Sequence, residues 1–72
     1  MKIPLLSTVA LIEDIPNEGL TRGQIGTVVE ELYASNEWAV LVEFADQEGR
    51  AYAMVPLLPK QLLLLHRNYR AA

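Results

Sequence analysis

Three glycines fall within eight residues in the stretch Gly19-Leu-Thr-Arg-Gly-Gln-Ile-Gly26, and glycine-rich loops in other proteins bind phosphates through their backbone N–H groups. A Walker-type loop needs Lys-Ser/Thr directly after its last glycine and a helix that begins there. Here Gly26 is followed by Thr-Val-Val, which is typical of a strand. A dinucleotide-binding loop is disfavoured as well, because it requires a βαβ unit. We interpret Gly19 and Gly23 as bend residues with positive φ, and Gly26 as a position where two backbones approach closely.

The residues that could support catalysis form no recognisable constellation. His66 is the only histidine and the chain contains no cysteine, so no spaced set of metal ligands is present. Ser7 or Ser35 could supply a nucleophile, but no sequence pattern brings either one together with His66 and a carboxylate. We therefore expect no catalytic residue, no metal and no cofactor, and a protein that is not an enzyme.

Carboxylates crowd the first half of the chain, where Lys2 and Arg22 are the only basic residues before residue 37. The adjacent pairs Glu13-Asp14 and Glu30-Glu31 are expected to be solvated, because neighbouring side chains in a strand point to opposite faces and do not share a proton. One end of the domain should be electronegative and should suit a basic partner. The acidic residues predicted to bind a partner are Glu13, Asp14, Glu18, Glu30 and Glu31.

Three aromatic residues could also contribute to binding. Trp38 follows the same period-two pattern as Val40, Val42 and Phe44, which predicts a place in the core or at the rim of a barrel. The alternative is that Trp38 anchors a partner. Tyr33 and Tyr52 allow the same two interpretations, so all three aromatic residues join the predicted partner-binding set.

Length and composition limit the protein to one small domain. The 72 residues are 51% hydrophobic and 21% charged, too apolar for a disordered chain. The formal charge of −3 disfavours binding to nucleic acid, although Arg67 and Arg70 beside Tyr69 could touch RNA. No export signal is visible around Pro4, and no apolar run approaches the roughly 20 residues that span a bilayer. We expect a cytoplasmic protein.

β-Strands must position these residues. The first strand is predicted from Ser7 to Asp14 and is followed by a long loop. A bulge near Gly26 would bring Ile25 and Val28 to one face of the second strand. The elements predicted after the first strand are strands at 25–33, 38–44 and 50–55, the last two forming a hairpin, then a 3₁₀ turn at 59–62 and a strand at 62–65.

This order of elements predicts an all-β fold, a small five-stranded SH3-like barrel with a short 3₁₀ turn before the last strand. Closure of the barrel should remove the exposed sheet edges. We expect the barrel to occupy residues 1–66 and residues 67–72 to form a flexible C-terminal tail.

Four segments resemble the DUF4926 family of small bacterial proteins of unknown function: 6–14, 19–30, 42–46 and 61–63. The strand that begins Gly26-Thr-Val28 resembles, to a smaller extent, KOW-type barrels. The family resemblance implies the barrel fold and a bacterial setting, with no known activity. The sequence departs from the expected pattern at Pro56-Leu-Leu58, where a more polar approach to the last turn is expected.

The leading functional hypothesis is a non-enzymatic protein-interaction module. It could be the neutralising or accessory member of a bacterial two-protein pair, because a small acidic domain suits a basic partner. The competing hypothesis is a KOW-like RNA- or ribosome-associated barrel, which would require a basic face. Self-association is compatible with either hypothesis.

Overall fold

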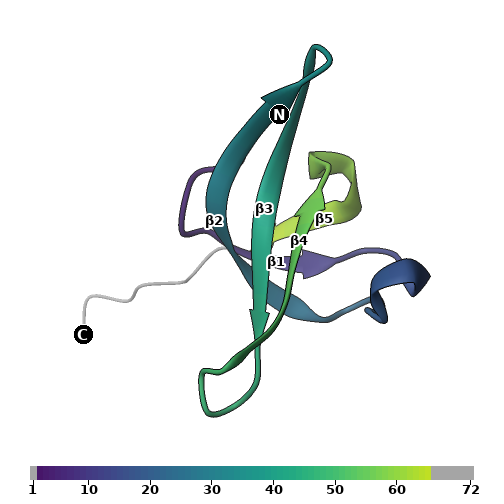
Figure 1. Cartoon of the computed structure of the whole chain (residues 1–72), viewed down its shortest axis with the longest axis vertical. Coiled ribbons are helices and arrows are strands. Elements are labelled where there is room, and N and C mark those ends of the chain that lie inside the picture. Colours follow the sequence, from purple (N-terminus) through teal and green to yellow (C-terminus); the bar gives the residue numbers. More distant parts are fainter. Residues whose placement is uncertain (1, 66–72) are drawn as a thin grey trace.

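The computed structural model describes residues 2–65, which form one antiparallel sheet of five strands in the order β4-β3-β2-β1-β5 (Figure 1). A long loop separates β1 from β2, and a 3₁₀ turn precedes β5, so the predicted SH3-like barrel is confirmed. His66 and the predicted tail at 67–72 lie outside the described residues. The elements are β1 (Thr8–Leu11), η1 (Pro16–Glu18), β2 (Ile25–Ala34), β3 (Glu37–Ala45), β4 (Ala51–Leu57), η2 (Pro59–Gln61) and β5 (Leu62–Leu65).

The sheet has two free edges, because no ladder joins β4 to β5 within residues 2–65. The predicted closure is therefore incomplete. The predicted end of the fourth strand at Val55 is also wrong, since β4 continues through Pro56, opposite Leu41, to the buried Leu57. Proline is tolerated there because β4 is an edge strand, whose outward-facing groups have no ladder partner. The apolar residues after Val55 thus complete a strand and contribute to the core.

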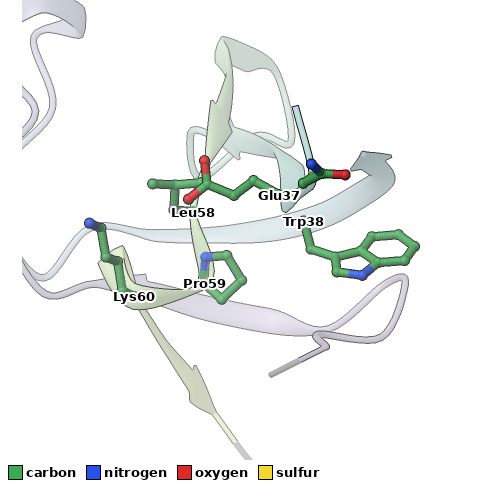
Figure 2. Close-up of a pocket in the computed structure, with 6 residues that line it drawn as sticks. Glu37, Trp38, Leu58, Pro59 and Lys60 are labelled. Carbon is green, nitrogen blue, oxygen red and sulfur yellow. The ribbon is translucent and has the colours of Figure 1, made fainter. Parts of the chain in front are cut away.

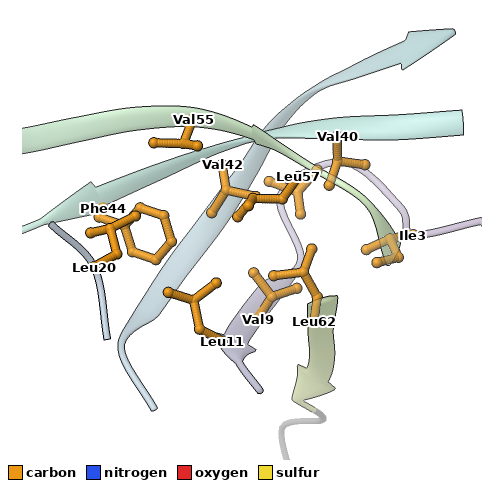
Figure 3. Packing of buried hydrophobic residues seen from close by; sticks show 11 residues of the cluster. Ile3, Val9, Leu11, Leu20, Val40, Val42, Phe44, Val55, Leu57 and Leu62 are labelled. Carbon is orange, nitrogen blue, oxygen red and sulfur yellow. The ribbon is translucent and has the colours of Figure 1, made fainter. Parts of the chain in front are cut away.

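The core is built from the inward side chains of all five strands (Figure 3). Phe44 and Val42 are completely buried and Val40 nearly so, which confirms the period-two prediction for β3. Two core residues come from outside the strands: Ile3 is 1% exposed and Leu20 is 2% exposed. Burial of Ile3 fixes the N-terminal segment against the barrel. The full set is Ile3, Val9, Leu11, Leu20, Val28, Val40, Val42, Phe44, Val55, Leu57 and Leu62.

Gly26 takes an inward position opposite Val9. A Cβ atom at Gly26 would lie 2.6 Å from Val42 Cγ1 and 2.9 Å from the backbone oxygen of Glu43. The predicted close approach at Gly26 is therefore confirmed. The predicted bulge at this position is wrong, because glycine itself fills the inward place and Ile25 points outward, 56% exposed.

The bulge lies three residues later, between Val28 and Glu30, where the register of β2 against β3 shifts. Val28 still faces the buried Val42, but beyond the extra residue Glu30 pairs with Leu41 on the outer face. Without the shift, simple alternation from Val28 would turn Glu30 inward. The bulge therefore decides which face of the sheet each β2 side chain takes between Glu30 and the hairpin turn.

Two turns hold the ends of these strands. β1 ends at Leu11 and not at Asp14, because Asp14 belongs to the β1–β2 loop and its Oδ1 accepts the backbone N–H of Arg22 at 2.8 Å. The predicted positive φ angles within this loop are confirmed at Gly19 and Gly23. Ser35 and Asn36 join β2 to β3 with φ angles of 54° and 62°, as in a type I′ hairpin turn. This tight turn fixes the last pairs of the hairpin.

Candidate interaction site

An exposed aromatic pair lies at the end of the β2–β3 hairpin. The turn and the bulge together place Tyr33 directly opposite Trp38, with ring centroids 4.7 Å apart and planes tilted by 55°. Trp38 belongs to the same face as the buried Val40, but the hairpin extends beyond the rest of the barrel (Figure 1). Trp38 is therefore 45% exposed and Tyr33 57% exposed. Trp38 occupies the rim, one of the two positions that the sequence pattern allowed.

A lysine and a carboxylate adjoin this pair. The Nζ atom of Lys2 lies 5.1 Å from the ring centroid of Trp38 and 3.8 Å from Glu31 Oε2. Glu31 precedes Tyr33 by two residues on β2 and pairs with Val40, so its side chain shares the face of Tyr33. We call Lys2, Glu31, Tyr33 and Trp38 the cation–aromatic cluster. It brings one ammonium group, one carboxylate and two rings together on the surface.

A pocket of about 330 Å³, open to solvent, lies beside Trp38. It forms where the start of β3 faces η2. Figure 2 shows Pro59 between Lys60 and Trp38, with Glu37 among the residues that line the same opening. A volume of this size is at the lower end of the range for small-ligand sites and accepts one or two side chains of a protein partner. The lining residues are Asn36, Glu37, Trp38, Leu58, Pro59 and Lys60.

The eight predicted partner-binding residues do not form one surface. Glu31, Tyr33 and Trp38 come together in the cluster, whereas Glu30 points to the outer face. Tyr52 lies on β4, 53% exposed, and its hydroxyl oxygen accepts a hydrogen bond from Gln24 Nε2 at 2.9 Å. The three remaining carboxylates, Glu13, Asp14 and Glu18, are exposed and follow β1 in the loop that leads to β2.

Two of these loop carboxylates have structural partners. Asp14 accepts the backbone N–H of Arg22, as described above, and Glu13 Oε2 accepts a hydrogen bond from Gln61 Nε2 at 3.2 Å. Glu13 thereby joins the loop to η2, and Glu18 lies in η1. Glu30 pairs with Leu41 and Glu31 pairs with Val40, so these adjacent carboxylates lie on opposite faces of β2, as expected for neighbouring side chains in a strand.

Three residues around the cluster, Lys2, Glu37 and Pro59, could not be assigned to it from the sequence. Lys2 belongs to no periodic element, and only the burial of Ile3 places it near Trp38. Glu37 and Pro59 line the pocket because the hairpin and η2 approach each other in space. The predicted 3₁₀ turn at Pro59 was a usable signal for η2, but no pattern connects it with Trp38.

Two of the four basic side chains within residues 2–65 pair with carboxylates. Lys2 pairs with Glu31, and Arg50 pairs with Asp46 and Glu48 at 3.6 and 3.3 Å. Arg22 and Lys60 are the other two basic residues of this part of the chain, and they belong to different elements, the β1–β2 loop and η2. The described residues therefore present no basic face.

Among residues 2–65, no three His, Cys, Asp or Glu side chains are grouped so that they could hold a metal ion. The same residues contain no helix that is long and apolar enough to cross a membrane.

Comparison with known proteins finds one family. The model of the domain of unknown function DUF4926 matches residues 5–64. Searches of curated proteins and of solved structures find no match to the chain. The matched segment contains Glu31, Tyr33, Trp38 and the whole pocket, while Lys2 precedes it.

Proposed function

The chain belongs to the DUF4926 family, as its sequence predicts, and from this premise we propose that it is a non-enzymatic protein-interaction module of the bacterial cytoplasm. Its partner binds at the Tyr33–Trp38 pair and the adjoining pocket. The family has no known function, so the proposal depends on the geometry of this site.

The observation that carries the proposal is the exposure of two aromatic rings, in tilted contact with each other, beside a pocket. Tyr and Trp side chains are enriched among the residues that dominate binding energy in protein interfaces, because they bury a large area with few rotatable bonds. Tyr33 and Trp38 are half-exposed on the β2–β3 hairpin, and Pro59 and Leu58 add apolar surface beside Trp38. Such a surface is pre-organised for a protein partner.

The charge distribution supports a basic protein over a nucleic acid as the partner. The chain carries a formal charge of −3, and two of the four basic side chains within residues 2–65, Lys2 and Arg50, pair with carboxylates, whereas a KOW-like barrel would need a basic face. A small acidic domain attracts a basic protein at long range and raises the association rate. On this ground we propose that the protein is the neutralising or accessory member of a two-protein pair.

The experiment is affinity capture of the tagged protein from a bacterial host that carries it, with mass spectrometry of what is retained. Trp38→Ala should lose the retained protein, because it removes the larger ring of the pair. Tyr52→Ala is the matched control, since Tyr52 is 53% exposed against 45% for Trp38 but lies on β4 and does not line the pocket. Thermal melts of both variants should establish that they fold. Retention of the same proteins by the wild type and both variants would contradict the proposed site.

A further inference from the structure

We propose that the cation–aromatic cluster is the binding place for a basic side chain, lysine or arginine, of the protein partner, and that Lys2 occupies this place in the free protein. The inference rests on the proposed function and specifies the chemistry that the site recognises. Its partner is a protein segment that presents a basic residue next to an apolar one.

The cluster already binds an ammonium group. Lys2 Nζ lies 5.1 Å from the centroid of the Trp38 ring, within the distance of about 6 Å at which a cation is attracted to the negative face of an aromatic ring. The carboxylate of Glu31 lies 3.8 Å from the same nitrogen. An aromatic face and a carboxylate that converge on one cation are the two elements needed to recognise a basic side chain.

Lys2 holds this place weakly. Its side chain is 64% exposed, and its contact with Glu31 is an ion pair at 3.8 Å, longer than a charge-assisted hydrogen bond. Exposed pairs of this kind contribute little, because water screens the charges and both side chains lose rotamer freedom. The backbone is fixed by the buried Ile3, so the Lys2 side chain can leave without disturbing the fold. An incoming cation therefore displaces Lys2 at a small cost.

The surroundings of the cluster favour a protein segment over a free cation. The pocket beside Trp38 adds the apolar surface of Pro59 and Leu58, which a residue adjacent to the basic one can cover. Glu37 lines the same pocket and supplies a second carboxylate to it, beside Leu58 (Figure 2). Lys60 also lines the pocket and would repel a basic side chain of the partner, but Pro59 lies between Lys60 and Trp38 (Figure 2).

The test uses two short peptides, both N-acetylated and C-amidated. One contains Gly-Ser-Lys-Leu-Ser-Gly, and the other replaces its lysine with the neutral norleucine. Binding is measured by NMR from the shift of the Trp38 indole N–H, which reports on the cluster directly because the chain contains one tryptophan. The proteins are the wild type, Lys2→Met, Glu31→Gln and Glu30→Gln. Thermal melts accompany each titration.

The lysine peptide should bind Lys2→Met about two- to five-fold more tightly than the wild type, because methionine keeps the apolar stem and removes the competing ammonium. Glu31→Gln should weaken binding by a similar factor. Glu30→Gln is the matched control, since it makes the same change of charge one residue away on the opposite face, and it should leave the affinity unchanged. The norleucine peptide should bind all four proteins more weakly than the lysine peptide and should not distinguish Lys2→Met from the wild type.

Three outcomes would overturn the inference: no binding of the lysine peptide even to Lys2→Met, equal or weaker binding by Lys2→Met than by the wild type, or equal effects of Glu30→Gln and Glu31→Gln. Each leaves the proposed function standing if affinity capture still depends on Trp38. Conversely, if the Trp38→Ala variant captures the same proteins as the wild type, the proposed function is contradicted whatever the peptide titrations show.

Discussion

Gly26→Ala is predicted to destabilise the barrel although the added group is one methyl. The new Cβ would lie 2.6 Å from Val42 Cγ1, 2.9 Å from the Glu43 backbone oxygen and 3.0 Å from Phe44 Cδ1. Val42 and Phe44 are completely buried, and the backbone of Glu43 is held opposite Thr27 in the β2–β3 ladder, so none of the three can move freely. The methyl group therefore forces β2 away from β3.

The loss of stability in Gly26→Ala follows from overpacking of the core, which costs about 1–3 kcal/mol. We expect the upper part of that range, because one of the clashes is with backbone. Loss of glycine flexibility in the unfolded chain offsets about 0.4–1 kcal/mol. We expect a net loss of about 2 kcal/mol and a fall in Tm of about 8–16 °C. The loss is large for a domain of this size, whose total stability is about 4–11 kcal/mol.

The assay is urea unfolding followed by circular dichroism, with Gly19→Ala as the control. Gly19 has a φ angle of 68° and open space around its Cα, so its substitution costs backbone strain alone. Val42→Ala should relieve part of the clash, so Gly26→Ala should lower the free energy of unfolding less in the Val42→Ala protein than in the wild type. Gly19→Ala should lower it equally in both proteins. Double-mutant cycles measure this difference in coupling. A Gly26→Ala protein with wild-type stability, or additive effects of Gly26→Ala and Val42→Ala, would refute the reasoning.

Three further predictions concern the core, the loop and nucleic acid. Phe44→Ala should lower the free energy of unfolding, measured in urea, by about 3–5 kcal/mol and leave a domain of this size largely unfolded. A cooperative melt near the wild-type Tm would show that Phe44 is not central to the core. Asp14→Ala should cost about 0.5–1.5 kcal/mol of stability, because the backbone N–H of Arg22 loses its acceptor. Glu18→Ala, in the same loop, should change stability by less than about 0.5 kcal/mol. Equal effects of the two substitutions would contradict the role of the Asp14 contact. A structured RNA titrated into the protein at about 50 and 200 mM salt should bind at neither salt concentration. The RNA-associated alternative would be favoured by micromolar binding that weakens with salt and that Arg67→Ala and Arg70→Ala abolish.

Much of the fold could be predicted because local patterns agree with it. The alternation from Trp38 to Phe44 identifies β3 and its inward side chains, and the glycines at 19 and 23 mark the bend before β2. The proline at 59 marks η2, and the order of elements then leaves few topologies other than the barrel. These signals are local, so a single sequence carries them.

The errors occurred where packing between distant segments overrides a local rule. Gly26 has no side chain to count in an alternating pattern, yet it takes the inward place because Val42 and Phe44 fill the space above it. Pro56 ends a strand by local rules, but β4 is an edge strand and continues to Leu57. Ile3 belongs to no periodic element and is buried all the same.

The candidate site was predicted only in part, for the same reason. The sequence identified Tyr33, Trp38 and Glu31 as separate candidates, but the bulge between Val28 and Glu30 is what turns Glu31 and Tyr33 to the face of Trp38. The position of the bulge depends on the register with β3, which no local pattern in β2 reveals. Lys2 joins the site through the burial of Ile3, a contact between the chain's start and its core.

The most direct test of the central claim is the fluorescence of Trp38 during titration with the captured partner, because it is the only tryptophan of the chain and lies in the proposed site. The partner should be compared with a version of itself in which any tryptophan has been replaced by phenylalanine. The Trp38 emission should show a saturable blue shift as the indole leaves water, with the midpoint equal to the Kd measured by calorimetry. A partner that binds by calorimetry while the emission of Trp38 stays unchanged would contradict the central claim.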